Sequence, residues 1–286
     1  MTRVAFTFVS REPAGNLVGY VRSIWFAKGR IAHQRERIAP TGSTVGAIVL
    51  GAPITQIPND GQAEPFDAVT GFLIGPHDRP IVNEPSAETH CVGIVTAPAA
   101  CRAVFGLDPA PLRGRIVDLL AAWPAGVPLR RRLMAMSDNG SEPDAMLDAV
   151  EAALRDGIDG ADPGLDRCAM AVAALEHDPG RSIAELAASL GLSHGHLDRE
   201  FTRYVGLSPR ALARSLRVGA LLERIDVSAP VMWSEHATAL GWYDQAHLIR
   251  DFKKHTGVTP TEYQQAQRRL FEPDEQLPGF VPDATM

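Results

Sequence analysis

The sequence predicts an α+β protein of two domains, in which an N-terminal antiparallel β barrel or sandwich with helices precedes an all-α domain. Three observations support this class. The chain has 286 residues, enough for two hydrophobic cores. Short runs rich in β-branched residues fill residues 3–100, and apolar residues recur at helical spacing after Leu112. The last third of the chain also contains an internal repeat.

The β-rich region consists of short apolar runs bounded by Gly, Pro and Asn, such as VRSIWFAKG, TVGAIVLGAP, AVTGFLIGP and HCVGIVTAP. Closely spaced turn signals between such runs are typical of a small antiparallel barrel or sandwich. The aromatic residues Trp25, Phe26 and Phe72 are candidates for the lining of an effector pocket. Aromatic residues in a small β domain more often belong to the core, so both interpretations stay open.

Helical patterns follow in RIVDLLAAW, PLRRRLMAM and DAMLDAVEAALRD, and then the Gly- and Asp-rich segment 156–164 predicts a linker. We therefore place a sensing or dimerisation domain at 1–155 and a helical domain at 165–270. Such a linker implies few contacts between the two domains. Residues 271–286 contain three prolines and four acidic residues, which predicts a loose or surface-laid tail.

The repeat relates residues 187–209 to residues 237–260, with Gln245 as one inserted residue. The two segments share residues at matched positions, among them Leu190/Leu240, Gly191/Gly241, His196/His247, Leu197/Leu248, Arg199/Arg250, Phe201/Phe252, Gly206/Gly257 and Pro209/Pro260. Each copy reads as a helix, a tight glycine turn and a second helix. The sequence therefore predicts two helix-turn-helix units.

Capping signals define the helix ends in both copies. Ser182 and Glu185 form a capping box, Gly191 ends the first helix, and the next helix begins near Ser193 or His194. In the first copy, Gly206 closes the second helix, and Ser208 with Pro209 opens the next one. In the second copy, the same signals are Gly241, Gly257, Thr259, Pro260 and Glu262.

The second helix of each unit has one apolar stripe, formed by Leu197, Phe201 and Tyr204 in the first copy and by Leu248, Phe252 and His255 in the second. The opposite faces supply candidates for reading DNA bases: Gly195, Asp198, Arg199, Gln245, Ala246, Ile249 and Arg250. An outward arginine on a helix in the major groove can donate two hydrogen bonds to guanine. The candidates for phosphate contacts are Arg203, Arg210, Arg217, Lys253 and Lys254.

The segments GHLDREFTRYVGLSP and GWYDQAHLIRDFKKHTGVTPTEY resemble the two halves of the AraC/XylS signature, over about residues 165–268. The resemblance implies a bacterial sequence-specific DNA-binding transcription regulator. It also implies seven helices, a long helix over 209–227 between the units, and recognition helices that enter successive major-groove segments. The sequence departs from the family pattern at two positions. His236 lies where an aliphatic residue is usual, and Gly195 gives the first recognition helix a weak start.

The N-terminal half resembles a less characterised β domain of some family members through YVRSIWFAKG, RERIAPTGSTV and GFLIGPHDRP. In better-known members such a domain binds an effector, mediates dimerisation, or does both. The resemblance therefore implies double-stranded DNA as a partner, with a small-molecule effector, a second copy of the chain and RNA polymerase as further candidates, and no cofactor. The alternative is an enzyme or small-molecule carrier that its helical domain recruits to DNA.

Other chemistry is weakly indicated. The net charge of −6 argues mildly against nucleic acid, but residues 165–270 are nearly neutral, with 13 Arg and Lys against 12 Asp and Glu. P-loop and dinucleotide motifs are absent from the sequence. Six residues of the β region could suggest a metal site but lack its spacing: His33, Glu36, His77, Asp78, His90 and Cys91.

The cysteines and the hydropathy pattern complete the sequence picture. Cys91, Cys101 and Cys168 show neither disulfide nor zinc-finger spacing, so we expect buried thiols. No charge-free apolar stretch of 18 residues is present, and the N-terminus does not have the pattern of a signal peptide. These features predict a cytoplasmic protein that has no membrane partner.

Overall fold

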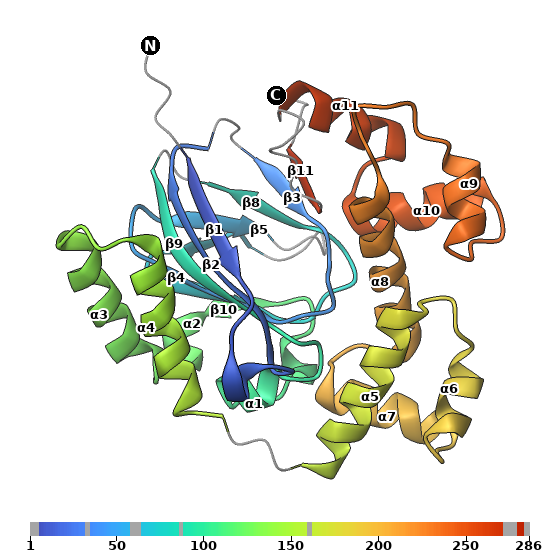
Figure 1. Cartoon of the computed structure of the whole chain (residues 1–286), viewed down its shortest axis with the longest axis horizontal. Helices are drawn as coiled ribbons and strands as arrows, with labels where there is room; N and C mark the ends of the chain where they lie inside the picture. Colours follow the sequence, from blue (N-terminus) through green and yellow to red (C-terminus); the bar gives the residue numbers. More distant parts are fainter. Residues whose placement is uncertain are drawn as a thin grey trace.

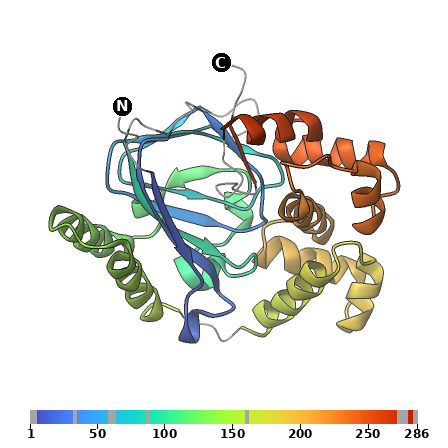
Figure 2. The ribbon, with the colours of Figure 1, turned by 45° about the horizontal axis from the view of Figure 1, so that its top comes forward.

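The computed structural model describes residues 6–31, 35–57, 64–85, 88–158, 162–270 and 279–282. The β-rich N-terminal part lies beside a helical C-terminal part, and a helical hairpin covers the opposite flank of the β-rich part (Figures 1 and 2). His33 lies outside the described residues. Among the helices of the described residues, none has the length and apolar character that crossing a membrane requires.

The N-terminal part contains two antiparallel sheets. The first has the strand order β1-β2-β9-β4-β7-β10 and contains β1 (Thr7–Arg11), β2 (Val21–Gly29), β9 (Thr89–Thr96), β4 (Val45–Val49), β7 (Gly71–Ile74) and β10 (Ile116–Asp118). The second has the order β11-β3-β8-β5-β6 and contains β11 (Phe280–Pro282), β3 (Glu36–Ile38), β8 (Ile81–Glu84), β5 (Ile54–Ile57) and β6 (Phe66–Ala68). Within the described residues neither sheet closes on itself, so the sandwich alternative is confirmed and the barrel is not.

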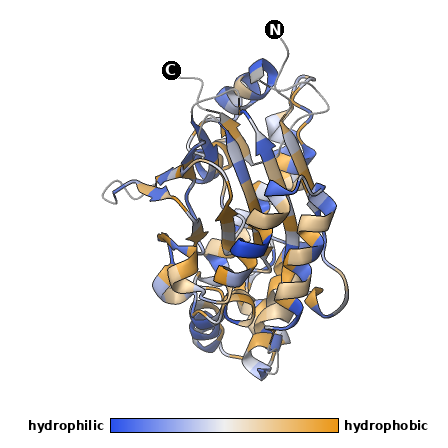
Figure 3. Ribbon diagram, turned by 90° about the vertical axis from the view of Figure 1, so that its left-hand side faces the viewer, coloured by the Kyte–Doolittle hydropathy of each residue, from blue (hydrophilic) through white to orange (hydrophobic). Residues whose placement is uncertain are grey.

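Alternation along the strands divides the N-terminal core into two layers. On β2, Phe26 faces the layer between the first sheet and the helices, whereas Trp25 and Ala27 belong to the layer between the two sheets. The covering helices are α1 (Cys101–Phe105), α2 (Leu119–Ala122), α3 (Gly126–Asp138) and α4 (Pro143–Arg155), with the short 3-10 turns η1 (Gly15–Leu17) and η2 (Ala110–Leu112). The flank with α3 and α4 faces the viewer in Figure 3, where hydrophobic and hydrophilic residues alternate along the ribbon.

The C-terminal part contains seven described helices: α5 (Pro163–His177), α6 (Ile183–Ser189), α7 (His194–Tyr204), α8 (Pro209–Arg224), α9 (Trp233–Ala239), α10 (Gln245–Thr256) and α11 (Pro260–Leu270). The number agrees with the resemblance, and α8 is the long connecting helix. α6 and α7 form the first helix-turn-helix unit, and α9 and α10 form the second. α7 and α10 are therefore the recognition helices.

The two parts are in extensive contact, so the prediction of few contacts across the linker is wrong. Arg22 on β2 forms an ion pair with Glu176 on α5, and Leu212 of α8 packs against Gly42. The Gly- and Asp-rich composition of residues 156–164 predicts a break between elements, but it carries no information about the surfaces that later pack together.

The tail contributes a strand to the N-terminal domain, which the sequence did not predict. β11 pairs with β3 in antiparallel register, and the Ala39 amide donates to the Gly279 carbonyl at 2.8 Å. Val281 is 1% exposed and packs in a cluster with residues of the second helix-turn-helix unit. The described part of the tail is therefore fixed rather than loose, because Val281 buries an apolar side chain where both domains meet.

Candidate nucleic-acid interface

Side-chain caps begin both recognition helices. The Ser193 hydroxyl accepts from the His196 amide at 3.2 Å, and the Asp244 carboxylate accepts from the His247 amide at 2.6 Å. The turns that precede these helices contain Gly191 with φ +69° and Gly241 with φ +75°. This left-handed conformation favours glycine, so the glycine turns of both units are confirmed.

The apolar stripes lie in the core as predicted. Leu197, Phe201 and Tyr204 are buried on α7, and Leu248, Phe252 and His255 are buried on α10. Phe252 makes edge contacts with Trp233 and Tyr263 in the second unit. His236 is half-buried, with its ring centroid 6.5 Å from that of Trp233, so an imidazole occupies the position that Leu186 fills in the first unit. The burial of the stripes leaves the opposite helix faces exposed.

Matched acidic residues fix both recognition helices to their units. Glu200 on α7 forms an ion pair with Arg167 of α5 and lies 3.4 Å from His196 Nε2. The hydrogen bond from Arg167 holds the pKa of Glu200 below its ordinary value. Asp251, the counterpart on α10, accepts from Trp242 Nε1 at 3.0 Å and lies 3.5 Å from His247 Nε2. The repeat thus extends to the contacts that orient each helix.

Most of the predicted base-reading residues are exposed on the outer faces of the recognition helices: Gly195, Arg199, Gln245, Ala246 and Arg250. Within the described residues, no hydrogen bond or ion pair holds the guanidinium of Arg199 or Arg250. Asp198 is half-buried. Ile249 is also half-buried and packs against the core of the second unit, which limits what it can offer to DNA.

The predicted phosphate-binding residues divide into two groups. Arg203, Arg210 and Lys253 are exposed. Arg217 donates to the carbonyls of Pro179 at 3.0 Å and Gly241 at 3.3 Å, and its guanidinium lies over the Trp242 ring. Lys254 Nζ lies 3.6 Å from Asp78 in the N-terminal domain. Arg217 therefore connects the two units, and Lys254 connects the two domains, because each has an acceptor of its own within the chain.

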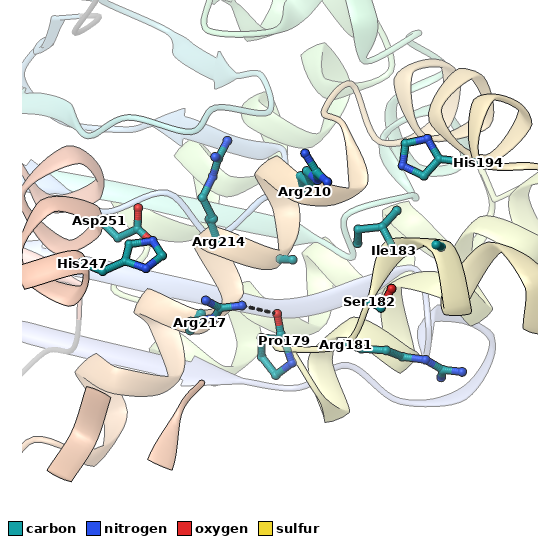
Figure 4. Close-up of a pocket in the computed structure, with 12 residues that line it drawn as sticks. Pro179, Arg181, Ser182, Ile183, His194, Arg210, Arg214, Arg217, His247 and Asp251 are labelled. Atoms are coloured by element: carbon teal, nitrogen blue, oxygen red, sulfur yellow. Dashed lines mark hydrogen bonds and ion pairs between the residues drawn. The ribbon is translucent and has the colours of Figure 1, made fainter. Parts of the chain in front are cut away.

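A cleft of about 510 Å³ lies between the two helix-turn-helix units (Figure 4). Arg210 and Arg214 project from α8, between His247 of α10 and His194 of α7, and Arg181 lies at the start of α6. The Arg214 Nε atom is buried without a partner among the described residues. Sequence reasoning missed Arg181 and Arg214. The position of Arg214 on α8, four residues after Arg210 and therefore on the same helix face, could have revealed it.

Tyr243 is another residue that the sequence analysis missed. It is 92% exposed and lies directly before Asp244, the N-cap of α10. An exposed aromatic ring at the start of a recognition helix lies where such a helix enters the major groove. Gln245, the residue that is inserted in the second copy relative to the first, lies two positions after Tyr243.

The three aromatic candidates for an effector pocket do not share one cavity. Phe26 packs in the layer under the helices, and Phe72 packs between the sheets. Trp25 lies against Gly93 and beside Phe8, with ring centroids 6.1 Å apart. Adjacent residues of a strand point to opposite faces, so Trp25 and Phe26 could not line one pocket. The core interpretation of these aromatic residues is the one that the packing supports.

A larger groove of about 880 Å³ lies between the two domains. Its N-terminal wall contains Tyr20 and Arg22, and its helical wall contains Glu176 on α5 and Glu223 on α8. Burial lowers the pKa of Arg22, while the neighbouring Glu223 acts in the opposite direction. The sequence patterns could not reveal this groove, since its walls come from segments that lie far apart in the sequence, such as those of Arg22 and Glu223.

The cysteines are in apolar surroundings. Burial raises the pKa of the Cys91 and Cys168 thiols to about 12 and that of Cys101 to about 11. All three are buried free thiols, as predicted. In the described part of the chain, no group of three or more His, Cys, Asp and Glu side chains is arranged to hold a metal ion.

Comparisons with known proteins agree with this organisation. Residues 186–266 match the model of a helix-turn-helix domain family, and residues 10–118 match a family described as a domain of unknown function (DUF6597). A search of curated proteins finds no match.

Several solved structures are similar to this one. ToxT from Vibrio cholerae is 11% identical, with a TM-score of 0.47 over 91% of this chain and 98% of ToxT. The C-terminal domain of AraT, a response regulator from Geobacillus stearothermophilus, is 22% identical, with a TM-score of 0.34 over 40% of this chain and 92% of that domain. A probable AraC family transcriptional regulator from Rhodopseudomonas palustris is 27% identical, with a TM-score of 0.31 over 35% of this chain and 95% of that protein. By the helix-turn-helix match and the repeated unit that the structure contains, the C-terminal part of this chain is a helix-turn-helix domain of the AraC type.

Proposed function

We propose that the chain reads a DNA site of two parts, with α7 in one major-groove segment and α10 in the next. The observation that carries this proposal is the pair of capped helices with exposed Arg199 and Arg250, separated by a cleft lined with arginine. Two such helices contact segments about one helical turn, or 34 Å, apart on one face of the duplex.

The arginine-lined cleft has a role in this arrangement. Between two successive major-groove segments the sugar-phosphate backbone passes the protein, and Arg181, Arg210 and Arg214 lie where it would pass. The Arg214 side chain lines this cleft, and a guanidinium there can donate charge-assisted hydrogen bonds to a phosphate oxygen. These contacts would fix the register of the protein without reading sequence.

Selection of binding sites from random duplex DNA by the full chain tests the proposal. We expect an enriched site with two motifs about one helical turn apart, protected from cleavage over both motifs. With five to eight phosphates neutralised, the logarithm of affinity should fall against the logarithm of salt concentration with a slope of roughly −4 to −7. Enrichment of a single short motif, or binding that does not respond to salt, would contradict the two-groove arrangement.

The interdomain groove is the place we propose for a small-molecule effector. Its walls come from both domains, so a ligand there would affect how the helical domain is held. Among the described residues that line it, four are acidic, Glu12, Asp166, Glu176 and Glu223, and one is a cation, Arg22, which is already paired with Glu176. This excess of carboxylates favours a neutral or cationic ligand with an apolar body over a carboxylic acid.

Octylamine and octanoate provide a matched pair of probes for this groove. We expect octylamine to raise the melting temperature of the full chain more than octanoate does, and Glu223→Gln to reduce that difference. Glu235→Gln, on the exposed start of α9, is the control. Equal responses to the two probes, or a Glu223→Gln variant that responds like the control, would remove the groove from consideration.

A further inference from the structure

One loop of the N-terminal domain touches the ends of both recognition helices. Residues 75–80 connect β7 in the first sheet to β8 in the second. At one end of this loop, Pro76 lies against Gly206, which follows α7, so closely that a Cβ on that glycine would be 3.0 Å from Pro76 Cγ. At the other end, a Cβ on Gly257, the C-cap of α10, would be 3.3 Å from Pro80 Cγ.

The loop is held firmly at the α7 end. The Gly75 amide donates to the Arg115 carbonyl at 3.0 Å, and the Gly114 amide donates to the Pro76 carbonyl at 2.9 Å. His77 is buried, with Nδ1 3.0 Å from the Gly75 carbonyl oxygen. The rings of Pro76 and Pro80 restrict φ at both ends of the segment. A loop with these restraints resists changes in length.

The charge in the middle of the loop adds a contact to the second unit. Asp78 Oδ2 lies 3.6 Å from Lys254 Nζ on α10 and 4.0 Å from Arg113 of the N-terminal domain. The Asp78 side chain is 21% exposed, and the structure therefore shields this ion pair only partly from solvent. Arg37 on β3 also packs against Gly257. Each recognition helix thus ends on the same domain, at opposite ends of one short segment.

We propose that loop 75–80 is a spacer that sets the separation and relative rotation of α7 and α10, and that Pro76, Asp78 and Pro80 are positioning residues for DNA recognition. The proposal rests on the proposed two-groove function. α8 joins the two units and Arg217 links them near the middle of that helix, which leaves each unit free to tilt about this connection. Contacts of both C-terminal helix ends with one restrained loop remove that freedom, since a tilt of either unit must break them.

Spacing discrimination on DNA measures this role directly. One inserted base pair moves the second motif by about 3.4 Å and rotates it by about 35°. The full chain and its variants would be titrated against the selected site and against versions with one or two base pairs added or removed between the motifs. The variants are Asp78→Asn with Pro80→Gly at the α10 end, and Pro76→Gly at the α7 end. The control is Pro53→Gly with Asp67→Asn, in the same domain but in the loop before β5 and on the outer strand β6.

For the unchanged chain and the control, we expect one added base pair to reduce affinity about tenfold, similar to the effect of one mismatched base pair. For the variants at either end of the loop, we expect a reduction of about threefold or less on the same scale. A spacing profile in these variants that matches the control would overturn the proposal. A lowered melting temperature together with lost binding to each motif alone identifies a variant that has merely unfolded. In that case the spacing profile of the variant at the other end of the loop tests the proposal. Failure of the selection itself would count against the two-groove function rather than against the spacer.

Discussion

Lys254 Nζ lies 3.6 Å from Asp78 Oδ2, whereas the neighbouring Lys253 is exposed on α10. Of these two adjacent lysines on one recognition helix, Lys254 therefore has an acidic partner within the chain, and Lys253 faces solvent. Lys253→Met should weaken binding about equally on all sequences and reduce the salt slope by about 1. Lys254→Met should leave the salt slope nearly unchanged, because its ammonium is engaged within the chain. Titration at several salt concentrations checks both, and equal slopes for the two variants would contradict the assignment.

Arg199→Ala and Arg250→Ala should each cost about 1 to 3 kcal/mol of binding free energy on the preferred site. Each change should relax base preference in a different motif, because the two guanidinium groups lie on different units. The Arg250 change should cost more, since Gly195 weakens the start of the first recognition helix. Repeating the site selection with each variant measures this. A loss of preference at the same base positions for both variants would exclude the two-groove model.

Arg214→Ala and Arg217→Ala separate a phosphate contact from a structural one. Arg214→Ala should reduce the salt slope by about 1 and leave base preference unchanged. Arg217→Ala should lower the free energy of unfolding by about 1 to 3 kcal/mol, because it removes donors to the Pro179 and Gly241 carbonyls and the packing on Trp242. Urea unfolding and salt titrations of both variants test the distinction. An Arg217 variant as stable as the unchanged chain would show that the connection between the units is weak.

Acid should destabilise the fold before its carboxylates protonate. Burial lowers the pKa values of His77, His90 and His255 below the ordinary value of 6.5. The unfolded chain then binds protons more readily than the folded chain does. The contribution of each histidine to the free energy of unfolding is therefore fully present above pH 6.5. It decreases as the pH falls below 6.5, by up to about 1.4 kcal/mol per pH unit for each histidine. The depressed pKa of Glu200 adds a loss only near and below its ordinary value of 4.5.

Urea unfolding between pH 7.5 and 5 measures this slope. His255→Gln should reduce it by up to one proton per molecule, whereas His177→Gln, at the exposed end of α5, is the control and should leave it unchanged. Stability that is constant over this interval would contradict the burial of the three imidazoles.

The strand that the tail adds to the N-terminal domain should contribute to stability. Val281→Asp would place an unpaired carboxylate where Val281 is 1% exposed, and we expect a loss of about 3 kcal/mol in the free energy of unfolding. Val69→Asp, at a position that is 59% exposed, should change stability by about 0.5 kcal/mol or less. Similar unfolding midpoints for the two variants would show that β11 is not needed by the fold.

The sequence predicted local structure better than contacts between distant segments. Ser182, Ser208 and Thr259 act as the caps that the spacing predicted, because capping depends on residues only a few positions apart. The buried stripes of α7 and α10 followed from helical periodicity for the same reason. Trp25, Phe26 and Phe72 could not be divided between two core layers until the sheets were known, although the alternation on β2 already separated Trp25 from Phe26.

The interface residues show the same limit. The exposed positions of Arg199 and Arg250 follow from the helix alone, and both were predicted. Arg217 and Lys254 look like free cations in the sequence, yet their partners, the Pro179 and Gly241 carbonyls and Asp78, come from segments that only the tertiary fold brings near. Both the interdomain groove and the contacts of loop 75–80 depend on packing between the two halves of the chain, which local sequence patterns do not encode.

The pairing of β11 with β3 has a consequence for the order in which the chain folds during synthesis. The N-terminal domain leaves the ribosome first, but its second sheet keeps an unpaired edge at β3 until all seven helices and residues 280–282 have followed. An open edge of this kind presents free backbone donors and acceptors to other nascent chains. The edge of β3 is therefore covered only when residues 280–282 have emerged, and not when the rest of the sandwich sequence is complete.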